Sequence, residues 1–307
     1  MVHGGLLHIL VEGMQSIPTR DNVGSKNIEQ MLLMMKQMCS SSPSLGAMLI
    51  KPLAQVRMNA MDASFIKGRG DEGMWRNFAL HVTASGAVDM IKTRPLICDY
   101  MECTGTKKKS TPKTCSGCHT IVYCSKACQK KDWRLQHRDE CSKARSETVE
   151  LRSKGLHYTQ RLRLQHGLFN CALANTAFGD SKFDLAVGHL TGVVRYFGWS
   201  TDPILPQDYL KMHGFLKPGP TGDVLTLNHY QDRRTQRLVL HYAKHCKANS
   251  LRLVEYQYPF GDKFVMMLAL LQKTSICDPE RDNMLDKYTL KYRVHRVLTV
   301  DRPNVRR

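Results

Sequence analysis

Apolar residues recur at helical spacing through the first part of the chain, and short breaks divide this pattern into segments. The breaks lie before Pro18, at the serine run that ends in Pro43, and in the loop 67–73, which lacks the pattern of a phosphate-binding loop. Pro52 should start or bend the helix in which it falls. We therefore expect residues 1–95 to form a helical region. The predicted helices cover 6–14, 25–39, 48–61 and 74–92.

Methionine is frequent in the second of these predicted helices. Met31, Met34, Met35 and Met38 lie close together there. A methionine-rich helix face can form an adaptable binding groove, but packing within a helical core is the favoured interpretation.

Residues 144–307 begin with a further helical pattern. Apolar spacing predicts helices between residues 146 and 200, the last of them over 185–196. Segments rich in glycine and proline, at 198–206 and 217–223, then break the pattern.

Strand-like patterns follow toward the C-terminus. Two apolar runs, 251–258 and 263–271, flank a short turn that contains proline and glycine, which is typical of a hairpin. Residues 290–295 alternate apolar and basic side chains, as in a half-buried strand. These features predict an α+β region with a small antiparallel sheet, and an α-rich α+β fold for the whole chain. The basic end, 302–307, is expected to be a frayed tail.

Length, composition and charge narrow the class of protein. The chain has 307 residues, 42% of them hydrophobic, which is enough for a sizeable core. It contains no run of 18 apolar residues and no basic segment before the first apolar stretch, so neither a transmembrane helix nor a secretory signal is expected. We expect an intracellular protein, nuclear or cytoplasmic. The formal charge of +18 attracts nucleic acid and acidic partners non-specifically and leaves the function open.

The chemistry of the sequence is concentrated in residues 98–141. Eight Cys and His residues fall there into four close pairs with the spacings C-x4-C, C-x2-C, C-x3-C and H-x3-C. Zinc prefers four such ligands in a tetrahedron, so the block predicts two closed structural sites in a reducing compartment rather than disulfides. Spacing alone leaves open whether the pairs interleave or fill in order. The eight residues are Cys98, Cys103, Cys115, Cys118, Cys124, Cys128, His137 and Cys141.

Local signals place part of this block on helices. Ser125 can cap a short helix, because its hydroxyl can accept from a backbone N–H of the first turn. Residues 127–141 continue in helical pattern, with Trp133, His137 and Cys141 at i, i+4 and i+8. This spacing predicts that the three side chains share one face of a helix.

The block resembles the MYND zinc finger. The resemblance rests on Cys115-Ser-Gly-Cys118, on Tyr123-Cys124-Ser125 with Cys128-Gln129, and on Asp132-Trp133 with His137 and Cys141. A single finger within otherwise unmotifed sequence is similar to the arrangement in many fungal MYND-finger proteins.

Two interleaved zinc sites are implied by this resemblance. The first ion would be held by Cys98, Cys103, Cys124 and Cys128. The second ion would be held by Cys115, Cys118, His137 and Cys141.

The resemblance also implies a peptide-binding surface. In that family a tryptophan lines a shallow groove that takes proline-rich peptides, and the matching positions here are Tyr123, Gln129 and Trp133. The alternative interpretation is that Trp133 packs against the metal sites, because so small a finger has little core of its own.

Patterns of catalytic sites do not support an enzyme. The chain lacks a Gly-x-Ser-x-Gly elbow, a His-Glu-x-x-His helix and a Rossmann fingerprint. Some MYND fingers occur in SET-domain lysine methyltransferases, but here Asn228-His229 is followed by Tyr230-Gln231 and lacks the cysteine that such enzymes need. His241 and His245 lack an evident third ligand, so a basic helix face is favoured there over a metal site.

The favoured function is therefore a non-catalytic protein-interaction module, for a protein partner or a proline-rich peptide, in transcriptional regulation. A nucleic-acid-binding factor is the alternative that charge and zinc suggest, although the lysines of the finger lie in a loop rather than among aromatic residues. A divergent SET-MYND methyltransferase is less favoured. The expected regions are a helical segment 1–95, the finger 96–143 and an α+β segment 144–307.

Overall fold

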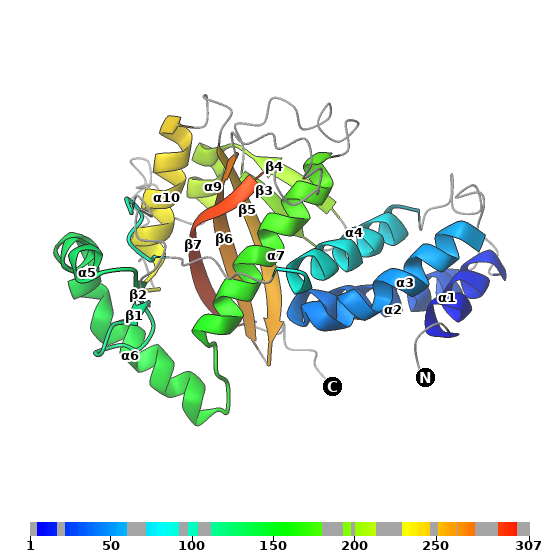
Figure 1. Ribbon diagram of the computed structural model, residues 1–307, viewed down its shortest axis with the longest axis horizontal. Coiled ribbons are helices and arrows are strands. Elements are labelled where there is room, and N and C mark those ends of the chain that lie inside the picture. Colours follow the sequence, from blue (N-terminus) through cyan, green and yellow to red (C-terminus); the bar gives the residue numbers. More distant parts are fainter. Residues whose placement is uncertain are drawn as a thin grey trace.

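The computed structural model contains a helical region, a small finger and a mixed sheet (Figure 1). The finger lies at one end of the molecule and the N-terminal helices lie at the other, with the sheet between them. The structure describes residues 5–16, 22–59, 72–91, 98–103, 112–179, 193–197, 200–212, 229–245, 251–261, 263–273 and 288–299. The predicted basic tail 302–307 lies outside the described residues.

Four helices form the N-terminal region, as the apolar spacing predicts. Pro43 is the first residue of the third helix, where its missing N–H costs no hydrogen bond. This helix runs on through the buried Pro52, which neither starts nor ends it. The helices are α1 (Gly5–Ser16), α2 (Asn22–Ser41), α3 (Pro43–Asn59) and α4 (Glu72–Asp89).

Helices α3 and α4 approach each other closely. A Cβ added at Gly46 would lie 2.1 Å from Cβ of Ser85, and one added at Gly86 would lie 1.9 Å from Cδ1 of Ile50. Both glycines are therefore needed at this crossing, because a larger side chain would force the helices apart.

The methionines of α2 are mostly outside this core. Met35 is buried, but Met31, Met34 and Met38 are exposed. Core packing, the favoured interpretation, is therefore correct for Met35 and wrong for the other three, which lie on the solvent side of the helix.

The C-terminal region contains a five-stranded sheet of order β4-β3-β5-β6-β7. The predicted hairpin is confirmed as β5 and β6, with Gly261 at φ +63° in its turn, and the alternating segment is confirmed as β7. The sheet extends beyond the small antiparallel one expected, because β3 pairs parallel to β5 and carries β4 on its other side. The strands are β3 (Val193–Phe197), β4 (Ser200–Ile204), β5 (Leu251–Phe260), β6 (Lys263–Lys273) and β7 (Tyr288–Thr299).

The predicted helix over 185–196 is wrong at its end. Val193–Phe197 form strand β3, whose run of β-branched and aromatic residues suits a strand paired on both sides. The earlier part of that prediction lies outside the described residues.

Helices cover both faces of the sheet, so the fold is α-rich α+β as expected. On one face α7 (Gln160–Gly179), together with α2 and α4, packs on Tyr256, Tyr258 and Met267. On the other face α9 (Pro206–Met212) and α10 (Asp232–His245) pack on Leu253 and Leu268. Strand β6 lies between β5 and β7 and is a nearly continuous apolar run, because both of its faces are buried.

The finger follows α4 and adjoins α10 in Figure 1. Its last helix does not stop at the predicted boundary near residue 143 but continues to Ser153. The elements are β1 (Lys113–Thr114), β2 (Val122–Tyr123), α5 (Lys126–Asp132), the π-helical turn η2 (Trp133–His137) and α6 (Arg138–Ser153).

Candidate zinc centre

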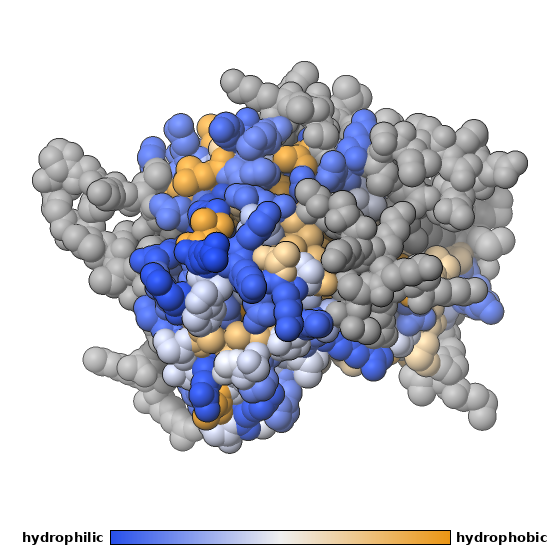
Figure 2. All heavy atoms as spheres, turned by 60° about the vertical axis from the view of Figure 1, so that its left-hand side comes forward, coloured by the Kyte–Doolittle hydropathy of each residue, from blue (hydrophilic) through white to orange (hydrophobic). Residues whose placement is uncertain are grey.

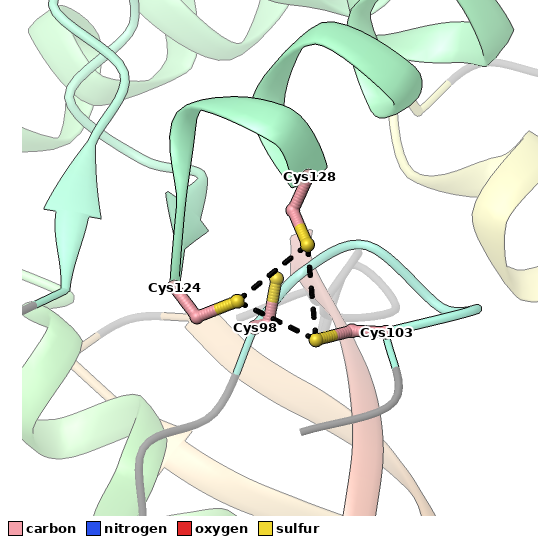
Figure 3. A group of neighbouring side chains, drawn as sticks. All are labelled: Cys98, Cys103, Cys124 and Cys128. Atoms are coloured by element: carbon pink, nitrogen blue, oxygen red, sulfur yellow. Dashed lines mark hydrogen bonds between the residues drawn. The ribbon is translucent and has the colours of Figure 1, made fainter. Parts of the chain in front are cut away.

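Four cysteines converge from two separate segments of the finger (Figure 3). Cys98 and Cys103 come from the segment before β1, whereas Cys124 and Cys128 come from the end of β2 and from α5. Sγ of Cys124 lies 3.5 Å from Sγ of Cys103 and 3.5 Å from Sγ of Cys128, and the last two sulfurs are 3.8 Å apart.

A second group joins the remaining three cysteines to the histidine. Sγ of Cys115 and Sγ of Cys141 are 3.9 Å apart, and Sγ of Cys118 is 3.7 Å from Nε2 of His137. In each group the four ligand atoms all lie within 4.8 Å of one another. The structure thus brings together all eight predicted ligands, in the interleaved sets that the resemblance implies.

These distances match a tetrahedral zinc site. Zn–S bonds of about 2.3 Å at tetrahedral angles place neighbouring sulfurs about 3.8 Å apart. A disulfide would bring them to about 2.05 Å, and the cysteines of both groups are free. The two groups therefore fit the two zinc sites of a finger, and Zn²⁺ bound there would supply the cross-links that the small core lacks.

The Cys115–Cys118 turn is shaped by backbone hydrogen bonds and by a glycine. The N–H of Cys115 donates to the carbonyl oxygen of Ile121 (2.8 Å), and the N–H of His119 donates to that of Cys115 (2.9 Å). A Cβ at Gly117 would lie 2.9 Å from Sγ of Cys141. Glycine at this position therefore leaves room for a ligand of the second site. His119 is exposed at φ +56° and takes no part in either group.

The helix that carries Cys128 begins as predicted. Ser125 is its N-cap, and its Oγ accepts from the N–H of Cys128 at 3.2 Å. The continuous α-helix expected over 127–141 is interrupted by the π-helical turn η2. This turn leaves Trp133 40% exposed while His137 is fully buried, so the two side chains do not share one buried face. Their rings still meet edge to face, with centroids 5.6 Å apart.

When no ion is present, burial favours the protonated form of two of the ligand thiols, whereas hydrogen bonds outweigh burial at Cys118, whose pKa is lowered to about 7, and at Cys124, whose pKa is also lowered. Burial raises the pKa of the Cys98 thiol, and burial together with the neighbouring Cys118 and Cys115 raises the pKa of Cys141 to about 12. A zinc ion inverts this preference, because a coordinated thiol is deprotonated. Packing of the ligands is therefore coupled to metal binding.

A buried arginine from the sheet side anchors the finger. Arg234 of α10 is fully buried and donates to the carboxylates of Asp132 (2.6 Å) and Glu140 (2.8 Å). A third bond goes to the carbonyl oxygen of Asp99 at 2.6 Å. All three acceptors belong to the finger, so a guanidinium fork with fixed geometry joins it to α10.

The same carboxylates support the ligand-bearing elements. Asp132 also accepts from the hydroxyl of Tyr123 at 2.7 Å. Oε2 of Glu140 lies 3.6 Å from Nδ1 of His137, the ring nitrogen that faces away from Cys118. At this distance the contact is electrostatic rather than a hydrogen bond, since Nδ1 of His137 has no hydrogen-bond partner. Sequence reasoning missed this anchor, because no local pattern links Arg234 to carboxylates about a hundred positions earlier.

The predicted peptide-binding residues lie at different depths. Trp133 is on the surface and Gln129 is half-buried one turn earlier in the chain. Tyr123 is fully buried, so its predicted place in a surface groove is corrected: its hydroxyl is used on Asp132, beneath the surface.

The other isolated candidates do not form sites in the described part of the chain. The rings of His241 and His245 are 4.3 Å apart on α10, but neither belongs to a group of metal ligands among the described residues. Cys39 and Cys171 are buried thiols, and burial raises the pKa of each to about 12. Cys246 and Cys277 lie outside the described residues.

The interleaved pairs define a two-zinc finger of cross-braced type. The family model described as MYND finger matches residues 98–141, so the chain carries a MYND finger there.

Curated relatives match over short segments only. The chain is 38% identical over 58 residues to histone-lysine N-methyltransferase ASHR1 of Arabidopsis thaliana, a segment that covers 17% of this chain and 12% of that protein. It is 40% identical over 63 residues to ubiquitin carboxyl-terminal hydrolase 19 of Arabidopsis thaliana, or 20% and 9% of the two chains. Over 52 residues it is 40% identical to programmed cell death protein 2 of Bos taurus, or 17% and 13%.

These matches cover about a tenth of each relative, so the likeness concerns the finger and not the whole proteins. No solved structure matched the chain. MYND fingers are protein-interaction modules and are not themselves enzymatic. Among the described helices, none combines the length and the hydrophobicity that a membrane span requires.

Proposed function

We propose that this chain is a non-catalytic interaction protein whose finger binds a proline-rich segment of a partner protein at the surface around Trp133. The observation that carries the proposal is the exposed indole: Trp133 is 40% exposed although it belongs to a finger whose tyrosines, Tyr100 and Tyr123, are buried. Proline-rich segments in the polyproline II conformation dock onto exposed aromatic side chains and lose little conformational entropy on binding.

The position of Trp133 suits such a role. It begins the π-helical turn η2, and turns of this kind occur often at functional sites. The edge contact between its ring and that of the fully buried His137 holds the inner side of the indole in place. The surface of this end of the molecule is mainly hydrophilic with separate hydrophobic patches (Figure 2), which favours a short segment over a broad apolar partner.

Charge around Trp133 narrows the chemistry of the partner. Exposed basic residues flank the indole on α5, η2 and the start of α6, among them Lys130, Arg134 and Arg138. A proline-rich segment with acidic residues beside the prolines would complement this surface and associate faster. The same basic residues favour nucleic acid as the second candidate.

Binding of labelled peptides to the full, zinc-loaded chain tests the proposal. A proline-rich peptide with acidic flanks should bind more tightly than the same peptide with its prolines replaced by alanine. Trp133→Ala should weaken binding by roughly tenfold or more, as is typical of a buried aromatic anchor. Met48→Ala, which removes an exposed apolar side chain from α3 at the other end of the molecule from the finger, is the control and should bind as wild type.

Equal affinity for both peptides, or an affinity that Trp133→Ala leaves unchanged, would contradict the proposal. Nucleic-acid binding would show a steep dependence on salt concentration and would survive Trp133→Ala. Methyl transfer to a histone peptide by the zinc-loaded chain would contradict the non-catalytic part. Roles in transcriptional regulation and an intracellular, nuclear or cytoplasmic location stay predictions from the sequence.

A further inference from the structure

A cavity of about 200 Å³ lies between the back of the finger and the sheet region. Its walls come from the turn after Cys118, from α6, from the 154–159 connection, from the start of α7 and from β7. It is separate from both cysteine groups and from the surface around Trp133, neither of which contributes a wall residue.

Arg163 of α7 lines this cavity and is only 3% exposed. Its Nε has no hydrogen-bond partner, and within the described ranges its guanidinium makes no ion pair. Arginine keeps its charge in proteins, so this side chain is a buried cation without a counter-ion. Such a group is strongly unfavourable unless an anion or water meets it.

The nearby carboxylate does not fill this role. Glu147 also lines the cavity, but its Oε1 is bonded to Nε2 of His229 at 2.8 Å. A second arginine, Arg152, also lines the cavity, and burial together with the charge of Arg163 holds the pKa of His295 well below its usual range. An incoming anion would therefore meet positive charge from Arg163 and Arg152.

Part of the cavity lining is apolar. Leu151, Leu156 and Val297 form this apolar wall, together with the ring of Tyr158, whose hydroxyl is engaged with Nδ1 of His166 at 3.0 Å. An inorganic ion would leave this wall uncovered. The volume is below the range of about 300–1,000 Å³ typical of pockets for drug-sized ligands, so it suits a molecule no larger than a single substituted ring.

We propose that this cavity binds a small organic carboxylate, with the carboxylate paired to the guanidinium of Arg163 and a short apolar body against Leu151, Leu156 and Val297. The planar fork of an arginine matches the two oxygens of a carboxylate. Because the wall includes residues of the finger, of α6 and of β7, a bound carboxylate would contact both the finger and the sheet region.

Isothermal titration of the full, zinc-loaded chain tests this site, with benzoate as the probe. Benzamide has a similar shape without the charge, and inorganic phosphate has the charge without the apolar body. Benzoate should bind with one site per chain, and benzamide and phosphate should bind at least roughly tenfold more weakly.

Substitutions of Arg163 separate charge from shape. Arg163→Met should weaken benzoate binding by roughly tenfold or more, and Arg163→Lys should give an intermediate affinity, because it keeps the charge but not the fork. Arg161→Met, an exposed arginine two residues earlier on α7, is the matched control and should bind as wild type. Since the free site holds an uncompensated cation, Arg163→Met should fold and keep its zinc.

Several outcomes would overturn the proposal. They are the absence of benzoate binding, equal affinity of benzamide, tighter binding of phosphate than of benzoate, or an affinity that Arg163→Met leaves unchanged. If Arg163→Met fails to retain zinc, the benzoate affinities of Arg163→Lys and Arg161→Met are compared instead. Equal benzoate affinities of those two variants would also overturn the proposal.

Discussion

The finger and the sheet region order their interiors by different means. The buried cluster of the finger is made of cysteines and tyrosines with few aliphatic side chains, among them Ile121 and Ala144. The cluster between α7 and the sheet is made of leucine, valine, methionine and aromatic residues. Apolar burial can hold the sheet region, whereas the finger needs metal bonds and the ion pairs of Arg234. The finger should therefore be destabilised by loss of metal or of Arg234, and the sheet region by changes to its buried core.

Removal of zinc should have the largest effect and should separate the two regions. Structural zinc contributes on the order of 10 kcal/mol to modules of this kind, so a strong chelator should unfold residues 98–141. Hydrogen exchange should then show lost protection in α5 and retained protection in β5 and β6. Retained protection of α5 in metal-free protein, or an equal loss of protection in β6, would contradict this difference between the two regions.

Loss of the arginine anchor should come next. Arg234→Met leaves Asp132 and Glu140 buried without their cation, which costs about 3–5 kcal/mol. Denaturant unfolding of the zinc-loaded protein measures this. Exposed Arg233→Met, whose pair with Asp139 lies at the surface, is the control and should change stability by less than about 1 kcal/mol. Equal effects of the two substitutions would argue against a buried anchor.

Low pH should lower the stability of the apolar core between the helices and the sheet, because a buried histidine there must take up a proton on unfolding. His81 packs between Phe169 and Tyr256, and burial, with repulsion by Lys36, lowers its pKa to about 3. The ring is neutral in the folded state, so its contribution to the free energy of unfolding is fully present above the unfolded pKa of about 6.5. As pH falls from there toward 3, the free energy of unfolding decreases by about 1.4 kcal/mol per pH unit.

His81→Phe should reduce this slope, because the variant has no proton to take up at that position. Unfolding free energies of both proteins at pH 7 and pH 5 give the comparison, and loss of zinc in acid affects both alike. His245→Gln, at an exposed histidine, should keep the wild-type slope. A slope that His81→Phe does not change would show that this ring is not the titrating group.

A single methyl group added in the finger should have the smallest effect on stability, and it should distinguish the two zinc sites from each other. Gly117→Ala places a Cβ 2.9 Å from Sγ of Cys141, so the second zinc site must shift, at a cost of roughly 1–3 kcal/mol. Competition with a chromogenic chelator should show one weakened site and one of wild-type affinity. Two equally weakened sites would contradict the separate ligand sets.

The sequence predicted what depends on local spacing. The pairs of cysteines, the cap at Ser125 and the hairpin of β5 and β6 each arise from residues close together in the chain, and each is confirmed. Interleaving of the ligand pairs came from the resemblance rather than from spacing, and the structure confirms it.

The features that sequence reasoning missed depend on residues far apart. Strand β3 pairs with β5 across more than fifty residues, and its short apolar run does not distinguish a strand from a helix. The hydroxyl of the buried Tyr123 donates to Asp132, which also accepts from Arg234 about a hundred residues away. The π-helical turn that exposes Trp133 has no pattern of its own in the sequence.

Native mass spectrometry of the full chain purified without added metal, with free thiols labelled in parallel, measures the metal content most directly. We predict two zinc ions per chain, with the seven cysteines of the finger labelled only after a chelator has been added. One ion or none in folded protein, or disulfides among Cys98, Cys115, Cys124 and their partners, would contradict a finger held together by two closed zinc sites.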